Sequence, residues 1–199
     1  MLSRVFLGSA IAAAVLTAGC TQSSSVKSPP IDSQPDQTQA PPRADPPTLE
    51  ILSWDQTQKR REEFRGKVVV LDVWSTYCDP CVREFPNLVA LQKRFGDKVR
   101  CISFDTDYSG AVREPPESFR KPVLEFLTKR GASGLLNVIS SDPSEDVFNK
   151  IHLGGPPAVF VYDQNGKLVK RFDNSQAPKV PELTYQHDIM PLVEKLLRK

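Results

Sequence analysis

The stretch Val68-Val69-Val70-Leu71-Asp72-Val73-Trp74 leads, three residues later, into Cys78-Asp79-Pro80-Cys81. Its near-continuous run of β-branched and apolar residues is typical of a strand that is buried on both faces. The segment that follows, from Cys81 to Phe95, has a helical pattern of apolar residues, so the two cysteines stand at a strand–helix junction. Two thiols separated by two residues can close and reopen a small disulfide ring. In this position they indicate a redox dithiol.

Two other interpretations of the cysteine pair remain open. The pair could form a permanent structural disulfide, or it could supply half of a zinc site. Zinc needs two further ligands, and the sequence contains no second C-x-x-C and no H-x-x-H spacing. The redox interpretation is therefore favoured over both.

The chain of 199 residues divides into three parts by composition. Residues 1–20 have the basic start, apolar centre and small-residue end of an export signal, and the apolar part is too short to span a bilayer. Residues 21–48 are rich in Pro, Ser and Gln, lack aromatic residues and are expected to form a disordered tether. Residues 49–199 have a length suited to one folded domain.

Thr17-Ala18-Gly19-Cys20 resembles a bacterial lipobox, in which the cysteine receives lipid after cleavage. We therefore expect lipidation of Cys20, with ordinary secretion as the alternative. The sequence has 4 cysteines, so Cys20 leaves a redox pair and Cys101, which we expect to be a small core residue. The formal net charge of +2 does not favour nucleic acid as a partner.

Apolar runs alternate with amphipathic stretches along the domain, which indicates an α/β fold with a central mixed sheet. Asn165-Gly166 separates two apolar runs and is a strong hairpin signal. The expected strands are 68–73, 99–104, 135–139, 158–162 and 167–172. The expected helices are 56–64, 81–95, 117–130, a short one between 142 and 151, and 184–197.

The segment 70–81 resembles the active-site region of thioredoxin-like proteins. With Gly66-Lys67 before it and Arg83-Glu84-Phe85-Pro86 after it, the segment is similar to the TlpA/ResA-type branch of membrane-tethered thiol–disulfide oxidoreductases. The segment 155–161 resembles the second motif of that family, in which a cis-proline faces the dithiol. The resemblance implies a thioredoxin-like three-layer sandwich, with helices on both sides of a mixed sheet, and a cis bond before Pro157.

The position of Cys78 at the start of a helix favours its thiolate, because unpaired N–H groups and the helix dipole stabilise negative charge. Cys78 is the expected nucleophile, and Cys81, one turn further on, is the expected resolving thiol. Around them we expect a substrate-binding region of Trp74, which packs under the dithiol, with Tyr77, Pro156 and Pro157.

Asp72 is a carboxylate within an apolar strand, six residues before Cys78, as is the buried acid of thioredoxin. Burial should raise its pKa, so that it can accept the proton of Cys81, through water, when that thiol attacks. The alternative is an acid at the end of the strand that points into solvent.

The expected function is disulfide exchange by an exported, lipid-anchored enzyme that acts as a reductant on the periplasmic or extracytoplasmic face of a membrane. The resemblance implies disulfide-bearing envelope proteins as partners, apocytochrome c among them, together with a membrane electron donor. No cofactor besides the redox-active disulfide and no metal is expected. The alternative is a thioredoxin-like copper carrier or another binding module without catalysis.

Overall fold

The computed structural model describes residues 45–173 and 183–198. The predicted signal peptide 1–20, the lipidation site Cys20 and most of the tether predicted for 21–48 lie outside these residues. No helix in the described part of the chain is both long enough and apolar enough to cross a membrane.

Within the described residues, six strands form one mixed sheet in the order β1-β4-β3-β2-β5-β6. β1, β4, β3 and β2 run parallel to one another, whereas β5 is antiparallel to β2 and β6 to β5. The strands are β1 (Glu50–Leu52), β2 (Val68–Trp74), β3 (Val99–Asp105), β4 (Leu136–Ser140), β5 (Ala158–Tyr162) and β6 (Leu168–Asp173).

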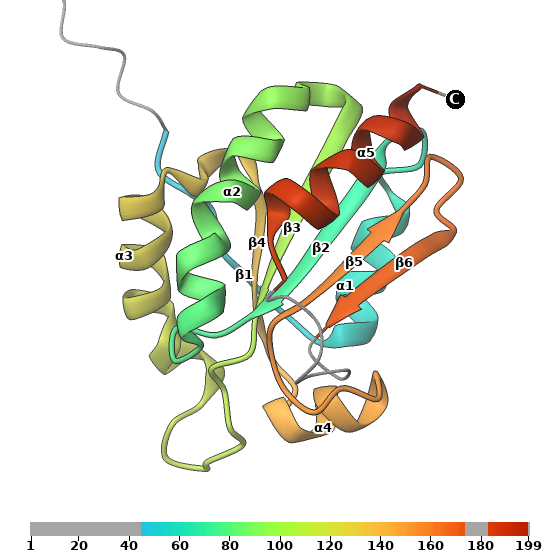
Figure 1. Cartoon of the computed structure of the whole chain (residues 1–199). Helices are drawn as coiled ribbons and strands as arrows, with labels where there is room; N and C mark the ends of the chain where they lie inside the picture. The colour runs from blue at the N-terminus through green and yellow to red at the C-terminus, as the bar shows by residue number, and fades with distance from the viewer. Residues whose placement is uncertain (1–44, 174–182, 199) are drawn as a thin grey trace, which may run out of the picture. The chain divides into compact units, whose positions relative to one another are not determined.

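Helices cover both faces of this sheet. The α-helices are α1 (Trp54–Glu62), α2 (Asp79–Phe95), α3 (Arg120–Arg130), α4 (Ser144–Lys150) and α5 (Met190–Leu197). The shorter turns are the 3₁₀ helices η1 (Gly96–Lys98), η2 (Pro116–Phe119) and η3 (Ala132–Gly134) and the π-helix η5 (Tyr185–Ile189). Figure 1 shows α2 and α5 crossing the near face of the sheet, with α3 beside α2.

The alternation of side chains along the strands creates two apolar cores, one on each face. Val68, Val70 and Trp74 of β2 pack on the face that carries α2, α3 and α5. Val69, Leu71 and Val73 pack on the opposite face with residues of α1 and α4, such as Trp54 and Val147. Every residue of β2 is buried, as the apolar run predicted. Asp72 has the register of the first set, so it points toward α2 and α5.

The three-layer α/β sandwich inferred from the sequence is confirmed, and so is the hairpin of β5 and β6 around Asn165-Gly166. Some details differ. β1 was not predicted, because three residues are too few to show a periodicity. The expected helix 117–130 is divided into η2 and α3, and the expected helix 184–197 begins as the π-helix η5.

Candidate active site

The two cysteines of the C-x-x-C pair form a disulfide at the N-terminus of α2, with their Cα atoms 5.2 Å apart. Cys78 is the N-cap residue, and its Sγ accepts a hydrogen bond from the main-chain N–H of Cys81 at 3.3 Å. Pro80 occupies the first turn, where the N–H that it lacks would have no partner. Cys78 is partly exposed, whereas Cys81 is only 3% exposed. Of the two residues, Cys78 is thus the one that a substrate can reach.

The loop before Cys78 is held in place by Thr106 and Asp107, the two residues that follow β3. Asp107 accepts three hydrogen bonds from this loop: from the Ser75 hydroxyl at 2.6 Å, the Thr76 N–H at 2.8 Å and the Thr76 hydroxyl at 2.6 Å. Thr106 donates to the carbonyl of Trp74 through both its N–H and its hydroxyl, each at 2.9 Å. These contacts fix the path of the chain that leads into the dithiol.

Asp105, at the end of β3, is fully buried beside Asp107 and accepts the main-chain N–H of that residue at 3.2 Å. Burial, reinforced by the charge of Asp107, raises its pKa well above the usual range. A protonated Asp105 avoids placing two negative charges side by side under the loop. Neither aspartate was predicted from the sequence, because neither belongs to a local motif.

The second motif also lies at the dithiol. The peptide bond between Pro156 and Pro157 is cis, as the resemblance predicted. Pro157 is buried and lines a small pocket together with Cys81 and Asp72. The fold therefore brings a proline distant in sequence against the buried member of the cysteine pair.

Asp72 is buried at the centre of β2, only 4% exposed, and pairs with Ser103 of β3 and Val159 of β5 in the sheet register. Loss of solvation raises the pKa of this carboxyl to about 7, although a hydrogen bond from Tyr185 opposes the shift. The prediction of a buried acid with a raised pKa is thus confirmed. An acid that ionises near neutral pH can both accept and return a proton at that pH.

Two further residues complete the surroundings of Asp72, and sequence reasoning assigned neither of them a role. The Tyr185 hydroxyl donates to Asp72 Oδ2 at 2.7 Å, and the Tyr185 main-chain N–H donates to Glu84 Oε2 at 2.9 Å. Glu84 lies one turn after Cys81 on α2 and also accepts from the side-chain amide of Asn87 at 3.1 Å. Glu84 raises the pKa of Asp72 through its charge. The sequence held one signal for Glu84: it lies three residues after Cys81 in a predicted helix, a spacing that places both residues on the same face.

These groups share one pocket beside the disulfide. It has a volume of about 10 Å³, close to the smallest space that holds a water molecule. Its lining includes side chains that can hydrogen-bond to such a water, and the residues are Asp72, Pro80, Cys81, Glu84, Pro157, Val159, Leu183 and Tyr185. A single water here could link the carboxyl of Asp72 to the sulfur of Cys81.

The other predicted substrate-binding residues lie in different surroundings. Tyr77 is 81% exposed next to the disulfide, and Pro156 is partly exposed, so both are accessible to a partner. Trp74 is fully buried, donates its indole N–H to Ser103 Oγ at 2.8 Å, and packs against Phe85 with ring centroids 4.8 Å apart. Trp74 therefore lies under the site, as expected, but its assignment to the substrate-binding region is wrong, because the side chain has no surface that a substrate could contact.

Cys101 is fully buried in β3, as expected for a core residue, and is free. Burial raises the pKa of its thiol well above the usual range. In the part of the chain that the structure describes, no cluster of three or more His, Cys, Asp or Glu side chains could hold a metal ion. Among the described residues, the cysteine pair is therefore not part of such a cluster.

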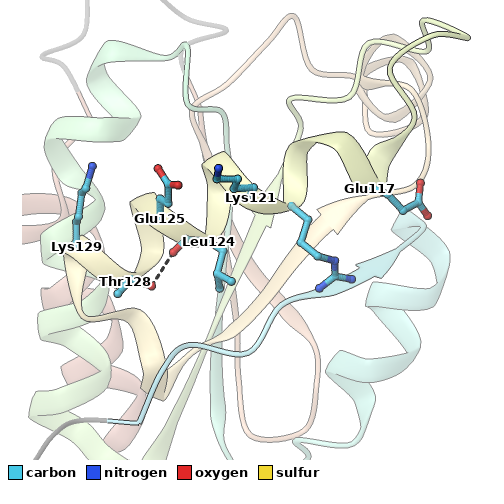
Figure 2. Close-up of a pocket in the computed structure, with 7 residues that line it drawn as sticks. Glu117, Lys121, Leu124, Glu125, Thr128 and Lys129 are labelled. Atoms are coloured by element: carbon cyan, nitrogen blue, oxygen red, sulfur yellow. Dashed lines mark hydrogen bonds between the residues drawn. The ribbon is translucent and has the colours of Figure 1, made fainter.

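A larger hollow, of about 610 Å³, lies along η2 and α3 between Glu117 and Lys129 (Figure 2). Its lining is a mixture of basic and acidic side chains, and the Thr128 hydroxyl within it donates to the carbonyl of Leu124 at 2.7 Å. It shares no residue with the pocket beside the disulfide. The chemistry of the cysteine pair therefore belongs to the smaller pocket.

The raised pKa of Asp72 makes the stability of the fold depend on pH. The folded protein keeps the proton of Asp72 up to a pH of about 7, whereas the unfolded chain loses it near the ordinary aspartate pKa of 3.8. Stability should therefore fall as the pH rises through this window. Asp72→Asn removes the effect, so the variant should be more stable than the unaltered oxidised protein at pH 8, by on the order of 4 kcal/mol, and similar to it near pH 4. Urea unfolding at both pH values measures the difference.

The control for this measurement is Asp97→Asn, which makes the same chemical change at a fully exposed carboxyl. This variant should change the free energy of unfolding little at either pH. A gap between Asp72→Asn and the unaltered protein that is the same at both pH values contradicts the assignment of a raised pKa to Asp72.

The comparisons with known proteins agree with the fold and the motifs. The thiol-disulfide oxidoreductase ResA of Geobacillus kaustophilus (strain HTA426) is 31% identical over 114 residues, which cover 56% of this chain and 57% of that protein. The ResA of Geobacillus thermodenitrificans (strain NG80-2) is 28% identical over 127 residues, 62% of this chain and 64% of that protein. The chain therefore covers less than two thirds of the length of each relative. The predicted resemblance to ResA-type proteins is confirmed.

A solved structure of a thiol-disulfide isomerase from Corynebacterium glutamicum matches with a TM-score of 0.52 and 19% identity, over 79% of this chain and 98% of that one. At this identity the match establishes the thioredoxin-like fold alone. The Redoxin family model matches residues 35–186, which is most of the chain and includes both motifs of the site. This chain belongs to the Redoxin family.

Proposed function

We propose that this protein is a thiol–disulfide oxidoreductase that reduces disulfides in other proteins through Cys78 and Cys81. The observation that carries the proposal is the disulfide itself, which sits at the N-terminus of a helix with its outer residue accessible and its inner one beside a buried acid. The ResA relatives, whose names state this activity, support it. The reaction needs no cofactor besides the disulfide.

The first step starts from the reduced dithiol. The thiolate of Cys78 attacks one sulfur of the substrate disulfide, the substrate S–S bond breaks, and the other substrate sulfur leaves as a thiolate that takes up a proton. The N-terminus of α2 stabilises the negative charge on Cys78 before attack. The product is a mixed disulfide between Cys78 and the substrate.

The second step releases the substrate. Cys81 gives its proton to Asp72 as its sulfur forms a bond with the Cys78 sulfur, and the bond between Cys78 and the substrate breaks. The departing substrate thiolate then gains a proton. In total the substrate disulfide gains two electrons and two protons, and the dithiol of the enzyme, which loses them, becomes the disulfide that the structure contains.

Single cysteine variants separate these two steps. Cys81→Ser should still attack but should accumulate the mixed disulfide with a disulfide-bearing peptide, because the resolving thiol is missing. Cys78→Ser should lose the activity, since Cys81 is buried. Mass spectrometry of the adduct and the rate of peptide reduction measure both effects.

Cys101→Ala is the matched control, because Cys101 is fully buried and lies outside the disulfide, so the activity should be retained. Formation of the adduct on Cys81 in the Cys78→Ser variant, at the rate seen for Cys78, contradicts the assigned order of attack.

The direction of electron flow that we propose is reduction of the substrate. Asp79 places a carboxylate next to Cys78 and is exposed, and a nearby negative charge disfavours the thiolate. A dithiol–disulfide couple is more reducing when the thiolate of its reduced form is less stabilised. In a redox titration against glutathione, the Cys78–Cys81 couple should therefore be more reducing than the glutathione couple, and Asp79→Ala should make it less so. A couple more oxidising than glutathione contradicts the proposed direction.

We further propose that the protein is exported and held at a membrane surface by lipid on Cys20. The support is the signal-like composition of residues 1–20 and the lipobox-like Thr17-Ala18-Gly19-Cys20. The partners would be disulfide-bearing envelope proteins, apocytochrome c among them, and a membrane protein that returns electrons to the disulfide.

Cys20→Ala tests the anchor. The variant should move from the membrane fraction to the soluble fraction after cell fractionation and should lose the mobility shift that lipid gives on a gel. Cys101→Ala again serves as the control and should stay with the membranes. An unchanged membrane association of Cys20→Ala excludes Cys20 as the anchor.

A further inference from the structure

The feature that the proposed reaction leaves unexplained is Tyr185, a phenol buried among the active-site acids. It is 2% exposed and comes from the π-helix η5, which is 113 residues away from Asp72 in the sequence. Its hydroxyl donates to Asp72 Oδ2 at 2.7 Å, and its main-chain N–H donates to Glu84 Oε2 at 2.9 Å. One residue thus binds both carboxyl groups of the small pocket beside the disulfide.

Local hydrogen bonds shape the segment that carries Tyr185, and an ion pair ties the helix that follows it to α2. Thr184 caps η5, because its hydroxyl accepts from the N–H of His187 at 3.3 Å and its N–H donates to Asp188 Oδ2 at 2.9 Å. Further on, Glu194 of α5 forms an ion pair with Arg94 of α2 at 2.6 Å. The position of the phenol relative to α2 and β2 is therefore set by the fold around it.

The titratable groups that face Asp72 come from three elements. α2 contributes Glu84 and Cys81, β3 contributes Cys101, and η5 contributes Tyr185. β5 contributes only the apolar Val159 to this contact. Glu84 and burial both disfavour a negative charge on Asp72, and Tyr185 is the group among these that stabilises it.

We propose that Tyr185 is a positioning residue of the dithiol reaction: its hydroxyl holds the Asp72 carboxyl beside Cys81 and stabilises its ionised form, while its main-chain N–H keeps Glu84 at the same pocket. This inference rests on the proposed function. One oxygen of Asp72 accepts a hydrogen bond from the phenolic O–H, which keeps its proton, and the other oxygen of the carboxylate is then the one that accepts the proton of Cys81. That transfer accompanies formation of the Cys78–Cys81 bond and cleavage of the bond between Cys78 and the substrate.

A purely structural role for Tyr185 predicts something different. A buried phenol needs an acceptor, and under a structural role the hydrogen bond to Asp72 meets that need without affecting the reaction of the dithiol. Under the proposed role, removal of the hydroxyl must raise the pKa of Asp72, because the ionised carboxylate loses a hydrogen bond that the protonated form needs less. The pH profile of the resolving step distinguishes the two roles, because only under the proposed role does the change in the pKa of Asp72 alter that step.

The test is Tyr185→Phe, which keeps the ring and removes only the hydroxyl. In the oxidised protein, the chemical shift of the Asp72 carboxyl carbon is followed by carbon-13 NMR as the pH changes. We expect the midpoint of this titration to rise by about one pH unit. The pH profile of the resolving step should shift upward by a similar amount, and the profile of the first attack by Cys78 should stay unchanged. A shift of both steps together, or of neither, overturns the inference.

The matched control is Tyr162→Phe. Tyr162 is also buried, at 6% exposed, and its hydroxyl donates to Gln58 at 3.4 Å on the opposite face of the sheet. The Tyr162→Phe variant also loses one phenolic hydroxyl. It should change neither the titration midpoint of Asp72 nor the pH profile of the resolving step. An equal shift in the two variants means that any lost phenol produces it, which overturns the role of Tyr185.

A measurement on the unaltered protein needs no variant to fold. The Cζ signal of carbon-13-labelled Tyr185 should titrate with the same midpoint as the carboxyl of Asp72, because the two groups share a hydrogen bond. A Tyr185 signal that does not respond across that pH range overturns the inference. These spectra are recorded without substrate, so they test the coupling between Tyr185 and Asp72 alone. The proposed function is tested separately, by whether the unaltered protein reduces the peptide.

Discussion

The structure depends on the burial of a single carboxyl group in the middle of its central strand. Asp72 lies between two apolar neighbours in β2, and such a group is unfavourable there unless other groups compensate. The fold supplies one hydroxyl from the C-terminal segment and a pocket that opens toward Cys81. The C-terminal segment is therefore more than a cover for the sheet, because its π-helix η5 brings a donor that stabilises the buried acid near neutral pH.

A second set of contacts, at the end of β3, holds the outer cysteine. Thr106 and Asp107 bind the main chain and hydroxyls of the loop that precedes Cys78, so that loop is attached to the sheet at several points. The two cysteines are thus positioned by different parts of the molecule. Cys78 depends on β3, and the surroundings of Cys81 depend on η5 and on the loop of Pro157.

The features that could be predicted from the sequence are those that lie within short segments. The buried strand, the cysteine pair, the acid before it, the hairpin and the cis-proline all belong to short segments with a strong composition or spacing. Tyr185 and Asp107 could not be found in this way, because their significance lies in contacts with residues 113 and about 30 positions away. β1 is too short for a pattern, and the π-helical start of the last helix depends on how Thr184 and Asp188 cap it.

The burial of Cys101 bears on how the molecule acquires its disulfide. A domain with three cysteines could in principle close the wrong disulfide ring. Once β3 is part of the sheet, this sulfur is shielded from solvent and keeps its proton, and only a deprotonated sulfur enters an exchange reaction. Mispairing is thereby restricted to chains that have not yet folded, and repeated turnover of the folded protein leaves the third cysteine untouched.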